Sequence, residues 1–180
     1  MSGKLTLISS ATASGSASVE FTSGIDSTYD EYVFYLVDIH PSGSDIDVMW
    51  IGSTDSGSSY GVATTTTMFR TAHKEDGSGG ALTYRDGRDA AQSTGNINLT
   101  GNAGNDNDQC VVCEFRLFSP SSTSKVKHFI ALAHSMQTGS NFFYQWYSAG
   151  YINTTSAVNA VKFFPGSGTI DGNIYLFGVS

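Results

Sequence analysis

Short apolar runs alternate with clusters of Ser, Gly, Asp and Asn along the whole chain. No long segment repeats its apolar positions with the period of a helix. Short runs bounded by turn-forming residues are typical of an all-β sandwich or barrel. The pattern therefore excludes a helical bundle or a coiled coil. It predicts a single all-β domain over residues 1–180, with about ten strands.

The clearest apolar run covers residues 32–39 and is apolar at both odd and even positions. Such a run predicts a central strand that is covered on both faces. Residues 45–51 and 110–118 alternate between apolar and polar side chains, which predicts strands with one buried face. Further strands are expected at residues 4–9, 17–22, 64–72, 126–133, 141–152, 158–164 and 173–179.

Two segments interrupt this pattern of strands. A single helical turn is expected at residues 25–29, where Asp26 or Ser27 can cap the first backbone N–H groups. The stretch 74–108 is rich in Gly, Asp and Asn, which predicts a long polar loop. Because long loops on a β scaffold frequently form binding surfaces, residues 74–108 are a candidate contact region.

The chain carries 9 basic and 16 acidic residues, which gives a net charge of −7 at pH 7. A general nucleic-acid-binding protein needs a basic surface, so this balance excludes that class. No apolar run approaches the roughly 20 residues of a membrane-spanning helix, so we expect no membrane insertion. The N-terminus lacks the apolar stretch of a secretion signal, which predicts synthesis in a cytoplasm. The 2 cysteines make no disulfide framework.

Four metal-ligating side chains occur at a spacing close to that of a zinc finger, namely Cys110, Cys113, His128 and His134. Cys110 and Cys113 fall in a predicted strand, where residues three apart point to opposite faces. His128 and His134 would lie roughly 20 Å apart along another strand. Neither pair can then hold one metal ion, so we expect no zinc site.

The sequence gives only weak support for a calcium site, a serine nucleophile or a glycosidase. The oxygen-rich loop at residues 102–108 offers weak calcium ligands in Asp106 and Asp108, but it lacks the glutamate of an EF-hand. No Gly-x-Ser-x-Gly nucleophile elbow joins a strand to a helix, and no two carboxylates stand out as a glycosidase pair. We therefore expect no catalytic residue, no metal and no cofactor.

Aromatic residues occupy both faces of the predicted strand at residues 141–152. The alternation assigns one face to the core and the other to a platform for sugars or another subunit. The platform residues are Phe143, Gln145 and Tyr147, and the core residues are Phe142, Tyr144 and Trp146. The alternative is that both faces are buried within the sandwich.

Distinctive sequence segments lie at residues 18–32, 117–123, 126–129, 149–155 and 172–179. They resemble small structural proteins of tailed bacteriophages, especially those that infect marine and cyanobacterial hosts. The resemblance extends over nearly the whole chain and implies a jelly-roll-like antiparallel β-sandwich in the virion. It implies no enzyme residues, and it leaves the choice between head and tail open.

The main hypothesis is a non-enzymatic outer capsid decoration protein that packs on the shell. Its expected partners are its own copies, for example in a trimer, and other virion proteins such as the major capsid or tail proteins. The negative charge argues against contact with packaged DNA. The alternative is a tail-fibre or appendage module that binds host-surface glycan through exposed aromatics, with Trp50, Tyr60 and Trp146 as candidates. The last hypothesis is a glycan hydrolase that uses Glu31 or Glu114.

Overall fold

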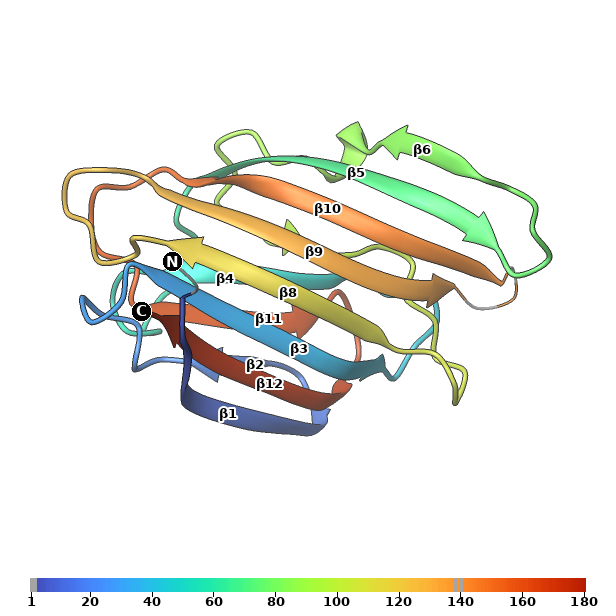
Figure 1. Ribbon diagram of the computed structural model, residues 1–180, viewed down its shortest axis with the longest axis horizontal. Coiled ribbons are helices and arrows are strands. Elements are labelled where there is room, and N and C mark those ends of the chain that lie inside the picture. The colour runs from blue at the N-terminus through green and yellow to red at the C-terminus, as the bar shows by residue number, and fades with distance from the viewer. Residues whose placement is uncertain (1–2, 138, 140) are drawn as a thin grey trace.

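Two antiparallel sheets pack face to face in the computed structural model, which describes residues 3–137, 139 and 141–180 (Figure 1). The larger sheet contains, in spatial order, β1 (Leu5–Ser16), β12 (Ile170–Val179), β3 (Glu31–Pro41), β8 (Val111–Phe118), β9 (Lys127–Gln137), β10 (Phe142–Ile152), β5 (Thr64–Lys74) and β6 (Ala81–Tyr84). The smaller sheet contains β2 (Val19–Phe21), β11 (Ala160–Pro165), β4 (Val48–Ser53) and β7 (Ile97–Asn98). The prediction of an all-β sandwich is confirmed, whereas the jelly-roll arrangement stays a prediction.

Aromatic side chains from both sheets fill the space between them. Trp50 of β4 lies against Phe115 of β8 and Phe129 of β9, with ring centroids 4.6 and 4.7 Å apart. Phe163 of β11 contacts Phe34 of β3, with ring centroids 5.2 Å apart. All five side chains are buried, so hydrophobic burial and tilted or edge-to-face ring contacts hold the two sheets together.

Alternation along the strands decides which side chains reach this core. In β8, Phe115 is buried, whereas its neighbours Glu114 and Arg116 lie half-buried on the outward face. β3 lies between β12 and β8 and buries the successive residues Val33 and Phe34, which point to opposite faces. The predicted central strand at residues 32–39 is thereby confirmed, but the expectation that both of its faces are covered is wrong, because Tyr35 and Val37 are only half-buried on the outward face.

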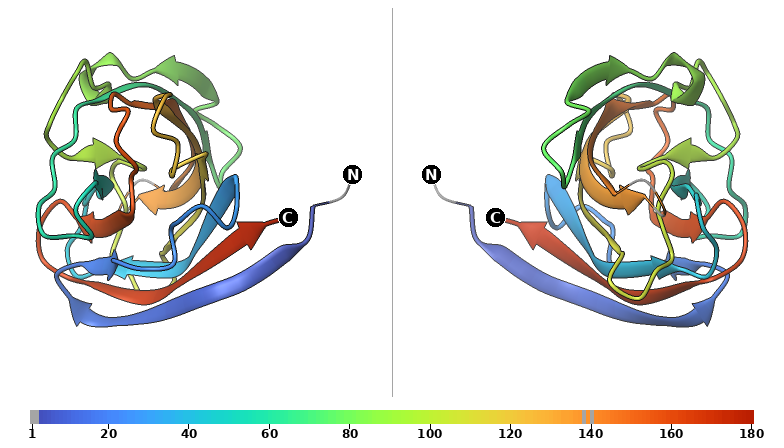
Figure 2. Two further views of the ribbon diagram at one scale, coloured as in Figure 1. Left: turned by 90° about the vertical axis from the view of Figure 1, so that its left-hand side faces the viewer. Right: turned by 90° about the vertical axis from the view of Figure 1, so that its right-hand side faces the viewer.

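The larger sheet curves around the smaller one, as the two views along the long axis in Figure 2 show. β1 and β12 form the outermost pair on one side, and their register shifts between Leu7 and Ser9. Such a bulge bends the strand and increases its twist. Next to this pair, the N–H of Lys4 donates to the carbonyl of Ser180 at 2.9 Å.

The predicted helical turn at residues 25–29 is wrong, because these residues form bends. The N–H of Thr28 donates to the Asp26 carboxylate at 2.8 Å, and the Tyr32 hydroxyl donates to the Asp26 carbonyl at 3.0 Å. Asp26 therefore closes a local turn instead of capping a helix. In the described part of the chain, no helix is long and apolar enough to cross a membrane.

The segment 74–108 is more ordered than a polar loop. It contains the edge strands β6 and β7 and a 3-10 turn, η1 (Asp86–Arg88). β6 pairs with β5, and β7 pairs with β4. The prediction of one uninterrupted loop is therefore wrong, because strands of two to four residues are too short to show a periodic pattern.

Candidate functional site

The outward face of the larger sheet carries a broad apolar and aromatic surface. Among the described residues, the exposed large hydrophobic side chains all belong to strands of this sheet, and their register places them on its outward face. They are Leu5, Leu7, Phe69, Leu82, Tyr84, Val112 and Phe143. With the half-buried neighbours Tyr35, Leu132, Tyr147 and Phe177, they form what we call the aromatic face. Soluble monomers rarely expose a contiguous apolar surface of this kind unless it binds something.

Strand register joins these residues into rows across the sheet. One row runs through Tyr175, Tyr35, Glu114, Leu132, Tyr147, Phe69 and Tyr84 on seven adjacent strands. At about 4.8 Å between strands, this row is roughly 30 Å long. Phe69 and Tyr147 stack within it, with ring centroids 5.1 Å apart. The aromatic face therefore extends over most of the width of the sheet, with Glu114 as the one charged residue of this row.

The charged side chains near the centre of the aromatic face form one ion-pair cluster, in which a single guanidinium group holds two carboxylates. Arg116 forms ion pairs with Glu31 at 2.7 Å and with Glu114 at 2.5 Å. The hydrogen bond to Glu114 is the main cause that raises the pKa of Arg116 above its ordinary value. Both carboxylates considered for a glycan hydrolase thus bind the same guanidinium group. A shallow hollow of about 240 Å³ lies beside them, between Tyr35 and Leu132.

The predicted division of residues 141–152 into two faces is confirmed. Phe143 is 44% exposed on the outward side, and Gln145 and Tyr147 follow it on the same side. Tyr144 and Trp146 are buried on the inward side, and Phe142 is half-buried there and packs against the core. The platform is thus one part of the larger aromatic face. The structure does not bring it together with Trp50 and Trp146, which lie in the core, or with Tyr60, which lies in the loop between β4 and β5.

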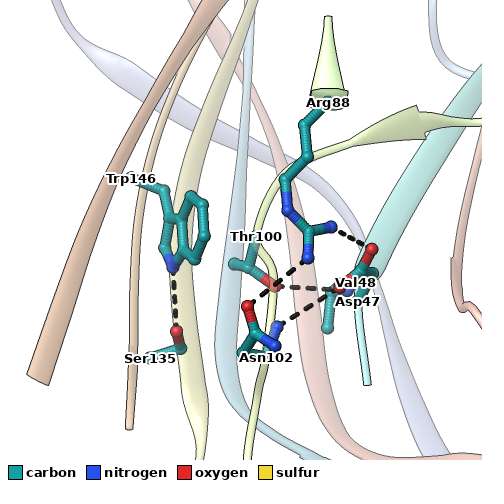
Figure 3. Close-up of polar contacts among 7 residues, drawn as sticks. All are labelled: Asp47, Val48, Arg88, Thr100, Asn102, Ser135 and Trp146. Atoms are coloured by element: carbon teal, nitrogen blue, oxygen red, sulfur yellow. Dashed lines mark hydrogen bonds and ion pairs between the residues drawn. The ribbon is translucent and has the colours of Figure 1, made fainter. Parts of the chain in front are cut away.

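Two of the three aromatic residues proposed for sugar stacking lie in the core. Trp50 and Trp146 are both 0% exposed. The indole N–H of Trp146 donates to the Ser135 hydroxyl at 3.0 Å, and the Arg88 guanidinium lies 5.6 Å from the centre of the indole (Figure 3). The expectation that Trp50 and Trp146 stack on a ligand is therefore wrong, because both indoles fill the space between the sheets.

Part of the predicted contact loop has a structural role. Arg88 forms an ion pair with Asp47 and donates to the side-chain oxygen of Asn102 at 3.4 Å. The N–H of Asn102 donates to Asp47 at 3.2 Å, and the N–H of Val48 donates to the Thr100 hydroxyl at 3.1 Å (Figure 3). These bonds tie the segment after β6 to the start of β4.

A pocket of about 420 Å³ opens on the outward face of the smaller sheet, on the opposite side from the aromatic face. We call it the small-sheet pocket. β11 contributes two of its side chains and β4 contributes Ile51, and the loops before β2, β5 and β7 contribute the others. The lining includes Ser18, Tyr60, Thr94, Asn96, Lys162 and Phe164.

Tyr60, the remaining candidate for sugar stacking, is held in place at this pocket. Its hydroxyl donates to the Glu20 carboxylate at 3.1 Å. The Lys162 ammonium lies 4.1 Å from the centre of the Tyr60 ring and 3.9 Å from Glu20. Burial raises the pKa of Tyr60 to about 12, and the Glu20 carboxylate adds to the shift. The phenol is therefore protonated, and its position is fixed, over the physiological range of pH.

The turn before Tyr60 is also rigid. The Asp55 carboxylate accepts hydrogen bonds from the Ser53 hydroxyl at 2.7 Å and from the Ser59 N–H at 2.8 Å. A further hydrogen bond from the Ser59 hydroxyl, at 2.5 Å, is the main cause that lowers the pKa of Asp55 to about 2, and the other two bonds add to it. Gly57 adopts a φ of +85° in the same turn, a conformation that glycine tolerates best. Tyr60 thus projects from a preformed turn.

The candidate metal ligands remain apart from one another. Cys113 is buried in β8, where burial raises the pKa of its thiol, and Cys110 lies 3.9 Å from Asp38. His128 and His134 both lie on the outward side of β9, against Tyr151 and Phe143 respectively. Asp106 and Asp108 are exposed. Over the described residues, no group of three His, Cys, Asp or Glu side chains is close enough to hold a metal ion.

Sequence reasoning did not identify most residues of the small-sheet pocket. The alternation of Val161 and Phe163 with Lys162 and Phe164 in β11 was the available signal, because it places the second pair on the outward face. Asn96 has no such signal, since it lies in an irregular segment that reaches the pocket only through the pairing of β7 with β4.

Comparison with known proteins found no match among protein-family models, curated proteins or solved structures.

Proposed function

We propose that the chain is a non-enzymatic structural protein of a bacteriophage particle, displayed on the capsid exterior, where it packs against other copies of itself through the aromatic face. The observation that carries this proposal is the concentration of exposed large hydrophobic residues on one outward face of the sandwich. The sequence segments that resemble phage structural proteins support the assignment to a virion.

Charge favours a second copy of the chain as the occupant of the aromatic face. Each copy carries a net charge of −7, so two copies repel unless they meet through a surface with little unpaired charge. The aromatic face partly meets this condition, because Arg116 pairs with both Glu31 and Glu114 there and compensates one of the two carboxylate charges. A symmetric contact between copies then buries apolar area while both carboxylates keep their ion pair with Arg116.

Two acidic substitutions on the aromatic face should weaken self-association. Phe69 and Phe143 are 39% and 44% exposed, so Phe69→Glu and Phe143→Glu alter this face with little effect on the core. An aromatic residue central to an interface contributes about 2 kcal/mol, so we expect the dissociation constant of the double variant to rise at least about thirtyfold. Sedimentation equilibrium of the full chain measures this constant.

The control for this experiment adds the same charge elsewhere. Thr123→Glu with Ser167→Glu changes two exposed loop positions outside the aromatic face. This control should self-associate like the unaltered chain. Equal weakening of both double variants would attribute the effect to net charge, and an unaltered chain that remains a monomer at high concentration would contradict the proposal.

A further inference from the structure

The small-sheet pocket is built differently from the aromatic face. It combines ring surfaces from Tyr60 and Phe164 with polar groups from Thr94, Asn96 and Lys162. Its volume of about 420 Å³ falls within the range of small-molecule sites in proteins. The lining of this pocket is more polar than apolar, so convergent polar groups beside two ring surfaces suit a small ligand with many hydroxyl groups.

The polar groups of the pocket include both donors and acceptors. The Lys162 ammonium lies over the Tyr60 ring at 4.1 Å and 5.7 Å from the centre of the Phe164 ring, and its nearest carboxylate oxygen is on Glu20 at 3.9 Å. That distance is too long for a hydrogen bond, so the ammonium protons are available to a ligand. Asn96 offers a carbonyl acceptor and an amide donor.

The positive charge of Lys162 and the negative charge of Glu20 compensate each other at the pocket, and this favours an uncharged ligand. Glu20 lies close enough to Lys162 to compensate the ammonium charge. An acidic ligand therefore gains little from Lys162, and it is repelled by the overall charge of −7. A neutral ligand with many hydroxyl groups fits better, because each hydroxyl both donates and accepts a hydrogen bond.

We infer that the small-sheet pocket binds a neutral hexose or N-acetylhexosamine unit of a glycan. The apolar C–H side of the sugar ring packs against Phe164 and against the part of the Tyr60 ring that Lys162 leaves uncovered, and its hydroxyl groups bond to Lys162, Asn96 and Thr94. The rigid turn around Asp55 supports this role, because a ring that is already in place loses little entropy on binding. The inference does not depend on self-association, since the pocket and the aromatic face lie on opposite sides of the sandwich.

The test uses the labelled full-length chain on an array of immobilised neutral and acidic oligosaccharides. We expect binding to a subset of the neutral glycans. Tyr60→Ala and Lys162→Met should each reduce this binding at least tenfold, whereas Tyr84→Ala, which removes an exposed tyrosine from the aromatic face, should leave it unchanged. The thermal midpoint of each variant shows whether it is folded.

Asn96→Ala keeps the inference testable if Tyr60→Ala fails to fold, because Asn96 is exposed and lies outside the core. It should also reduce binding at least tenfold. The inference is overturned by an absence of binding on the array, by binding to acidic glycans alone, or by binding that persists in the folded pocket variants. None of these results changes the expectation for self-association.

Discussion

Replacing Trp50 by alanine is expected to lower the free energy of unfolding by about 3–5 kcal/mol, the usual cost of removing a large aromatic side chain from a core. Trp50 is 0% exposed and lies within 5 Å of two other rings, so its loss leaves a cavity at the centre of the sandwich. Urea unfolding of the purified chain measures the change. A loss below about 1 kcal/mol would contradict this packing, since surface substitutions cost no more than that.

Trp50→Phe separates the contribution of ring packing to stability from the cost of the unpaired indole N–H group. The indole nitrogen of Trp50 is buried and has no hydrogen-bond partner among the described residues. Trp50→Phe removes this unsatisfied group together with part of the ring, so its cost should be smaller, roughly 1–2 kcal/mol. Tyr84→Ala, at a side chain that is 59% exposed, should change stability by at most about 0.5 kcal/mol and serves as the control.

Gly150→Ala is expected to destabilise the protein by about 3 kcal/mol or more, because β10 and β5 approach each other closely at this position. A Cβ atom at residue 150 would lie 2.1 Å from the carbonyl oxygen of Thr65 and 2.9 Å from the Cα of Thr66. Both atoms belong to backbone that is paired within the sheet, so they cannot move aside without breaking that pairing. The cost therefore exceeds the usual range for adding one methyl group to a core.

The matched control for this substitution is Gly87→Ala. No atom lies within 4 Å of a Cβ built at residue 87, and its φ is not in the left-handed region. Its stability should change by at most about 0.5 kcal/mol. Unfolding of Gly150→Ala and Gly87→Ala at the same urea concentration would contradict the close approach of β10 to β5 at residue 150.

The long strands could be predicted because their patterns are local. The alternation in residues 110–118 and 141–152 identified both the strands and the faces that enter the core. β6 and β7 were missed because they pair at sheet edges and have too few residues for a pattern. The turn at Asp26 was mistaken for a helix because aspartate is equally suited to a helix cap and to an Asx turn.

The candidate sites could be predicted only in part. The outward orientation of Phe143 and Tyr147 followed from alternation, but the extent of the aromatic face depends on the order of eight strands, which no local pattern contains. Trp50 and Trp146 were placed on a binding surface because of their residue type, although alternation had already assigned Trp146 to the core. The small-sheet pocket joins residues as far apart as Ser18 and Phe164, so only the fold reveals it.

The most direct test of the proposed function is the copy number of the chain in purified phage particles, measured by quantitative mass spectrometry after heads and tails are separated. A capsid protein that packs against its own copies should be present in many copies per particle, and it should remain with the heads. Absence of the chain from purified particles, or a few copies that travel with the tails, would contradict a role in capsid decoration.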